Sequence, residues 1–138
     1  MAARPNDPGS KPALETGPQT TISRGQTAIA MAFTEEVLAA SPDGILLIDG
    51  ETHHVIMFND AACRQLGYTR EEFAALGISD YQAIETPEET RRHVHQVLAG
   101  GGGEFDTLHR RKTGDLRNVH VWAKPIAVEG RPAFYTIY

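Results

Sequence analysis

This sequence of 138 residues lacks several features that would point directly to a function. Its only cysteine is Cys63, so no disulfide can form within the chain, and we expect a reducing, cytoplasmic compartment. No apolar run approaches the roughly 20 residues of a membrane span. The N-terminus carries no apolar signal-peptide core either. These absences predict a protein without direct membrane contact.

Positive charge is in deficit: 13 Lys and Arg stand against 18 Asp and Glu, a net charge of −5. Nucleic acids and anionic membranes are bound by clustered Lys and Arg. The short basic groups at Arg91-Arg92 and at 110–112 are interpreted as solvated faces or internal ion pairs. We therefore expect no nucleic-acid partner.

Catalytic and metal-binding patterns are also missing. No nucleophile stands with a general base, and the glycines at 100–103 follow a predicted helix instead of opening one, so they cannot cradle a phosphate. The adjacent His53 and His54 lack the further ligands of a closed metal site. The sequence thus predicts a domain that is not an enzyme, with no catalytic residues and no metal site.

The N-terminal part of the chain divides into two segments. Residues 1–27 hold half of the eight prolines and few large aliphatic residues, a composition typical of a disordered leader or linker. Residues 28–40 predict an amphipathic helix, since Ile29, Phe33 and Val37 recur every four residues.

Residues 41–138 predict one α+β domain. Apolar runs at 44–49 and 54–58 predict a hairpin, and residues 105–111, 117–127 and 133–138 predict three further strands. Short helices are expected at 60–66 and 70–75, one turn of helix within 77–85, and a longer helix from Pro87 to the glycines at 100–103. This order predicts an antiparallel sheet with its helices on one face.

Capping residues set the helix starts. Asn59 is a favourable N-cap, because its side-chain oxygen can accept a backbone N–H of the first turn. Thr69 with Glu72, and Thr86 with Glu89, fit the capping box, in which the cap and the third helical residue satisfy each other's backbone donors.

The segment Asn59 to Glu72, with its Gly67-Tyr68-Thr69 core, resembles the PAS (Per-Arnt-Sim) sensory domain. The turn at 112–114 and the strand ending at Pro125 are similar to the same family. The resemblance covers residues 41–138 and implies a PAS fold with a five-stranded antiparallel sheet. It also implies a sensory or interaction module of a longer, bacterial-type signalling protein. Its C-terminal output domain would be a histidine kinase or a diguanylate cyclase.

Alignment with light-sensing PAS relatives assigns the two faces of the sheet, because strand side chains alternate. The residues implied to face a ligand pocket are Thr107, His109, Val119, Val121, Ala123, Phe134, Thr136 and Tyr138. The opposite face, with Trp122, Tyr135 and Ile137, is apolar enough to predict a contact. We expect the helix bearing Ile29, Phe33 and Val37 to cover it, from the same chain or from the partner in a homodimer.

The resemblance does not extend to the cofactor sites of two PAS subfamilies. Light-oxygen-voltage domains carry a flavin-reactive cysteine on the third short helix, where this chain has Asp80, and Cys63 is interpreted as a buried thiol. Haem ligands lie earlier on the long helix than His93. His93 and His95 point about 200° apart and cannot simply share a metal. Neither haem nor such a flavin is expected.

Two functions remain open. In the first, the pocket binds a small ligand, which the small Thr107 and Ala123 favour. In the second, a ligand-free PAS module serves dimerisation and signal relay only, since Phe105, Phe134 and Tyr138 fill the space. His109 is either a ligand contact or a core histidine bonded within the protein.

Overall fold

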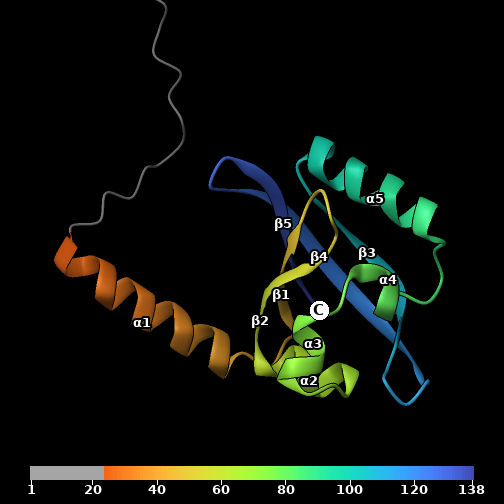
Figure 1. The fold of residues 1–138 in the computed structure, drawn as a ribbon, viewed down its shortest axis with the longest axis horizontal. Helices are drawn as coiled ribbons and strands as arrows, with labels where there is room; N and C mark the ends of the chain where they lie inside the picture. Colours follow the sequence, from red (N-terminus) through yellow and green to blue (C-terminus); the bar gives the residue numbers. More distant parts are fainter. Residues whose placement is uncertain (1–23) are drawn as a thin grey trace, which may run out of the picture.

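The computed structural model describes residues 24–138, which form an N-terminal helix and an α+β domain (Figure 1). The helices are α1 (Arg24–Ala40), α2 (Asp60–Leu66), α3 (Arg70–Ala74), α4 (Ile78–Tyr81) and α5 (Pro87–Gly100). The strands are β1 (Ile45–Asp49), β2 (Val55–Phe58), β3 (Gly103–Arg110), β4 (Leu116–Val128) and β5 (Arg131–Ile137).

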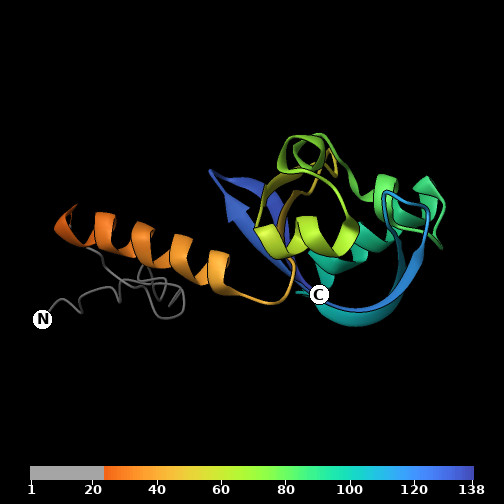
Figure 2. The same ribbon diagram turned by 90° about the horizontal axis from the view of Figure 1, so that it is seen from below.

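The five strands form one sheet in the order β2-β1-β5-β4-β3, and every neighbouring pair is antiparallel. The predicted α+β fold with a five-stranded antiparallel sheet is therefore confirmed. The central strand is β5, and in its pairing with β1 Ile45 lies opposite Ile137. Helices α2 to α5 lie on one side of the curved sheet (Figure 2).

Local chemistry places the helices where the sequence predicts them. The Asn59 side chain accepts the Ala62 N–H at the start of α2. Both capping boxes are present, at the starts of α3 and α5. Helix α2 ends at Gly67 with φ of 80°, a left-handed conformation that glycine adopts without steric cost.

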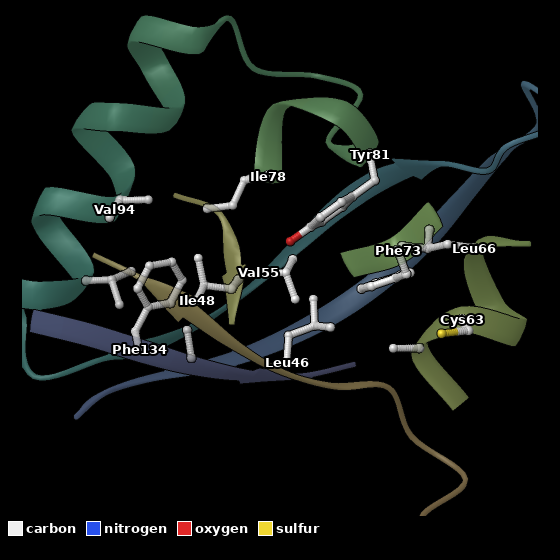
Figure 3. Packing of buried hydrophobic residues seen from close by; sticks show 13 residues of the cluster. Leu46, Ile48, Val55, Cys63, Leu66, Phe73, Ile78, Tyr81, Val94 and Phe134 are labelled. Carbon is white, nitrogen blue, oxygen red and sulfur yellow. The ribbon is translucent and has the colours of Figure 1, made fainter. Parts of the chain in front are cut away.

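The core lies between the inner face of the sheet and the helices (Figure 3). Leu46 and Ile48 of β1 are 1% exposed, and they pack in the same cluster as Leu66 of α2 and Phe73 of α3. At the opposite end, Val94 of α5 belongs to the same cluster. The alternation of buried and less buried residues along β1 follows from the two-residue period of a strand.

Helix α1 differs from the prediction in two ways. It begins at Arg24, four residues before the predicted start, because an established helix extends through residues of moderate propensity. It also projects away from the domain (Figure 2) and does not cover the outer face of its own sheet, which leaves coverage by a partner chain as the remaining alternative of the prediction. Its stripe is exposed, with Ile29 at 69%, Phe33 at 70% and Val37 at 49%. The rest of the predicted leader, residues 1–23, lies outside the described residues.

Within residues 24–138, no helix is long and apolar enough to cross a membrane.

Candidate ligand pocket

A cavity of about 60 Å³ lies between the inner face of the sheet and helices α4 and α5. Sheet residues form one wall: Ile48, Phe105, Thr107, His109, Val121, Ala123, Phe134, Thr136 and Tyr138. The other wall comes from α4, α5 and the segment between them: Ile78, Tyr81, Gln82, Glu85, Thr90, His93, Val94 and Val97. Figure 3 shows the Tyr81 ring extending from α4 over the inner face of the sheet.

Seven of the eight predicted pocket residues line this cavity, and the exception is Val119. Val119 lies opposite Thr107 in the register of β3 and β4, but it is half-buried and lines a separate hollow with Trp122 and Ile137. Placing Val119 in the pocket was therefore wrong. Strand alternation fixes the side of the sheet on which a residue lies, and it does not fix how far the covering helices reach.

The predicted outer-face residues Trp122, Tyr135 and Ile137 are half-buried within the chain. The rings of Trp122 and Tyr135 meet edge to face at 5.7 Å, and the Lys124 ammonium lies 5.5 Å from the Trp122 ring centroid. These contacts shield part of the apolar surface. A role for these residues in dimerisation stays a prediction.

His109 lies between two tyrosine rings deep in the cavity wall. Its imidazole contacts Tyr81 edge to face at 5.1 Å and Tyr138 at 4.9 Å between ring centroids. Burial disfavours the charged imidazolium and lowers the pKa of His109 to about 4. The His109 ring is therefore neutral at pH 7. Burial likewise raises the pKa values of the Tyr81 and Tyr138 hydroxyls, so both stay protonated.

Within residues 24–138, five buried side-chain polar atoms have no hydrogen-bond partner in the protein, and all five belong to residues that line this cavity. They are Gln82 Nε2, Thr90 Oγ1, Thr107 Oγ1, His109 Nδ1 and the Tyr138 hydroxyl. Buried polar groups are normally paired, because an unpaired one costs about 1–3 kcal/mol. The gathering of all five around one cavity therefore calls for an occupant that forms hydrogen bonds.

The orientation of the Gln82 side chain is set by its oxygen. Gln82 Oε1 accepts the backbone N–H groups of Ile84 at 2.7 Å and Glu85 at 2.8 Å. Because that end of the amide must be the acceptor, the remaining end is the NH₂ donor. The unpaired Gln82 Nε2 is thus a donor that lacks an acceptor.

Glu85 and His93 separate the cavity from the outside surface. His93 Nδ1 and Glu85 Oε1 are 2.9 Å apart, and the His93 ring packs on Phe105 at 4.3 Å. The same pair also lines an outer hollow beside Arg92. His95 faces a different hollow, so the two histidines of α5 diverge as predicted.

Sequence reasoning did not identify the helical wall as part of the pocket. A signal was present, because Thr90, Val94 and Val97 repeat on one face of α5, which is the face that lines the cavity. No sequence pattern marked Tyr81, Gln82 or Glu85, which reach the cavity only through the path of the chain between α4 and α5.

The cavity's dimensions bear on which cofactors could fit. A cavity that holds benzene measures about 150 Å³, so 60 Å³ cannot hold haem or flavin unless the walls move apart. The Asp80 carboxylate has a structural role, because it accepts the Gly77 N–H at 2.7 Å at the start of α4. Over residues 24–138, no three His, Cys, Asp or Glu side chains gather as metal ligands would.

Comparison with known proteins adds a family assignment to this geometry. The family model for the PAS fold matches residues 32–133. No curated protein resembles the sequence closely enough to count as a relative.

Several solved structures share the fold. The PAS domain of an HTR-like protein from Haloarcula marismortui has a TM-score of 0.74 at 21% identity, covering 82% of this chain and 93% of that one. A domain of the sensory box sensor histidine kinase/response regulator from Geobacter sulfurreducens has a TM-score of 0.64 at 19% identity. The match covers 80% of this chain and 95% of that one. The PAS domain of a LuxR-family transcriptional regulator from Burkholderia thailandensis, in complex with ethanol, has a TM-score of 0.60 at 15% identity. The match covers 75% of this chain and 94% of that one. At these identities the likeness shows the fold alone.

Proposed function

This chain belongs to the PAS family, and from that premise we propose that it is a sensory domain whose cavity binds a small molecule. The observation that carries the proposal is the set of five unpaired polar atoms around the cavity between the sheet and helices α4 and α5. A ligand that pairs with these atoms binds the folded state and stabilises it. Three of these five atoms belong to pocket residues that the sequence analysis predicted: Thr107, His109 and Tyr138.

The size of the cavity supports a small ligand. The relative from Burkholderia thailandensis is a PAS domain in complex with ethanol, a molecule of three heavy atoms. The cavity of about 60 Å³ in this chain suits a ligand of similar scale. The apolar part of the wall, from Ile48, Val121 and Phe134, would contact the carbon atoms of such a ligand.

Signal relay is the second part of the proposal. Tyr138 lines the cavity, and its backbone exchanges two hydrogen bonds with Gly44 at 2.8 and 3.0 Å, just before β1. A ligand that binds the Tyr138 hydroxyl thus acts on the segment that joins α1 to the sheet. We propose that the change passes through the sheet and the flanking helix α1 to a C-terminal output domain of a longer cytoplasmic protein. Relatives from sensor histidine kinases support a histidine kinase as that output.

A homodimer completes the proposal. Helix α1 exposes an apolar stripe that no part of its own domain covers, and the outer sheet face carries Trp122, Tyr135 and Ile137. A second copy of the chain could bury both surfaces at once, because each copy offers the two together.

The second candidate is the ligand-free PAS module that dimerises and relays signals. One observation favours it: Phe105, Phe134 and Tyr138 all project into the pocket region, where they leave only about 60 Å³. In this function, ordered water would pair with the five polar atoms.

Native mass spectrometry of the protein, with ethanol present as a small probe at a concentration on the order of millimolar, separates the two candidates. A matched variant is Ala123→Leu, which fills the cavity from a residue that is 1% exposed. We expect extra mass on the native protein, absent after denaturation and absent from Ala123→Leu. A bare native protein, with thermal stability that Ala123→Leu does not lower, would favour the ligand-free module.

A further inference from the structure

We propose that the cavity selects a small uncharged molecule that both accepts and donates hydrogen bonds, of the kind exemplified by a primary carboxamide. This inference rests on the proposed ligand-binding function and specifies the chemical class of the ligand. Three properties of the wall support it: a fixed donor, a set of hydroxyl groups, and the absence of an available charge among the lining residues.

The fixed donor is Gln82 Nε2. Its orientation is determined because Gln82 Oε1 is held by the N–H groups of Ile84 and Glu85. An NH₂ group can only donate, so the ligand must present an acceptor there. A carbonyl or hydroxyl oxygen meets that need, whereas a purely cationic donor group does not.

The hydroxyl groups come from three separate elements: Thr90 on α5, Thr107 on β3 and Tyr138 after β5. Each hydroxyl offers one hydrogen and two lone pairs. A ligand with N–H or O–H groups can therefore donate to them while its own oxygen accepts from Gln82 Nε2. A molecule with both kinds of group can pair with each hydroxyl in either direction, whereas a molecule that only donates leaves Gln82 Nε2 without an acceptor.

No free positive charge lies in the cavity wall, and its one carboxylate, on Glu85, is already bonded to His93. The only lining residues that ionise readily are Glu85, His93 and His109. Glu85 and His93 bond to each other at 2.9 Å, and the buried His109 is neutral at pH 7. A carboxylate ligand would lose its hydration without gaining a counter-charge, and it would lie near the Glu85 carboxylate. A cation would be dehydrated, would compete with His93 for the Glu85 carboxylate, and would leave Gln82 Nε2 without an acceptor.

Three nearly isosteric probes test this selection: acetamide, acetate and acetamidinium carry charges of 0, −1 and +1 at pH 7 on the same planar frame. A ligand of about four heavy atoms binds at best with a Kd on the order of tens of micromolar. Titration by NMR of the ¹⁵N-labelled chain, at probe concentrations up to tens of millimolar, measures affinities in this range. It also shows whether the backbone signals of cavity residues shift.

We expect acetamide to shift the signals of Gln82, Thr107 and His109 and to bind at least about tenfold more tightly than either charged probe. Tyr138→Phe removes one hydrogen-bonding hydroxyl and should weaken acetamide about three- to tenfold. Thr107→Val, on strand β3, should have the same effect. Tyr68→Phe is the matched control, because Tyr68 packs on Phe73 and does not line the cavity. It should bind acetamide as the unaltered chain does.

Tighter binding of acetate or acetamidinium would overturn the selection for uncharged ligands while leaving a ligand-binding cavity in place. If no probe shifts the cavity signals, the inferred ligand class is wrong. The proposed ligand-binding function would still be supported if native mass spectrometry shows extra mass bound to the folded protein. Equal affinities for all three probes, unaffected by Tyr138→Phe, would also contradict the inference.

Discussion

The side-chain amide of Asn59 donates a hydrogen bond to the carbonyl oxygen of Leu38, 3.0 Å away, and so ties the last turn of α1 to the domain. The same nitrogen donates to the Asp43 carbonyl at 2.9 Å, while the side-chain oxygen accepts the N–H groups of Ile45 and Ala62. Asn59 is 3% exposed, and these four bonds use both donors and both lone pairs of its amide. One residue therefore joins the end of α1, the start of β1 and the start of α2.

Replacing Asn59 should weaken both the domain and the attachment of α1. Asn59→Ala leaves buried backbone groups unpaired and removes a helix cap, so we expect the free energy of unfolding to fall by about 3 kcal/mol in urea denaturation. Asn59→Asp keeps the acceptor for Ala62 but loses both donors. It should speed amide hydrogen exchange in the last turn of α1 more than in α2. Equal exchange in both helices would contradict the proposed link.

The buried His109 predicts a dependence of stability on pH. Its pKa is about 4 in the folded protein, against an ordinary value of 6.5 in the unfolded chain. As the pH falls below 6.5, the unfolded chain therefore takes up a proton first, and the free energy of unfolding declines until pH 4. The loss from this residue is at most about 3 kcal/mol.

Urea denaturation at several pH values between 7 and 4.5 measures this effect. His109→Phe keeps a ring between Tyr81 and Tyr138 and should flatten the slope. His53→Asn measures separately the part of the slope that comes from the other histidine whose pKa burial lowers, and His53 lies in the β1–β2 turn outside the cavity. A slope that survives in His109→Phe would assign the effect to other groups.

The exposed apolar stripe on α1 predicts that the protein is a dimer in solution and that a charge placed in the stripe converts it to a monomer. Phe33 is 70% exposed in the single chain, and a Phe33→Glu charge would disrupt the apolar contact with a second copy. Light scattering should give a dimer for the unaltered chain and a monomer for this variant. Ala28→Glu adds the same charge on another face of α1 and should leave the dimer intact. An unchanged mass in Phe33→Glu would place the dimer contact elsewhere.

Cys63 should be protected from thiol reagents. It is 6% exposed, and burial raises the pKa of its thiol, so little reactive thiolate forms. We expect alkylation at pH 8 to follow the rate of unfolding and to accelerate sharply in urea. Reaction at the rate of a free thiol without denaturant would show that α2 opens locally.

Local patterns in the sequence were enough to predict many elements. Asn59, Thr69 and Thr86 marked helix starts because a cap depends on the residue itself and on backbone groups within three positions. Strand alternation grouped Thr107, Val121 and Thr136 on one face, and the resemblance to PAS domains implied that this face is the inner one. The same reasoning misplaced Val119, whose surroundings depend on how far the covering helices extend.

The sequence by itself therefore determined the fold class, the order of the elements and which strand residues share a face, because capping and periodicity act over a few residues. Only the tertiary structure brought Gln82 and the Glu85–His93 pair of the helical wall to the same cavity as Tyr138, more than 40 residues away along the chain. It also decided that α1 stands clear of its own sheet. These features depend on the packing of distant segments, and the balance of burial and hydrogen bonding across the whole domain sets that packing.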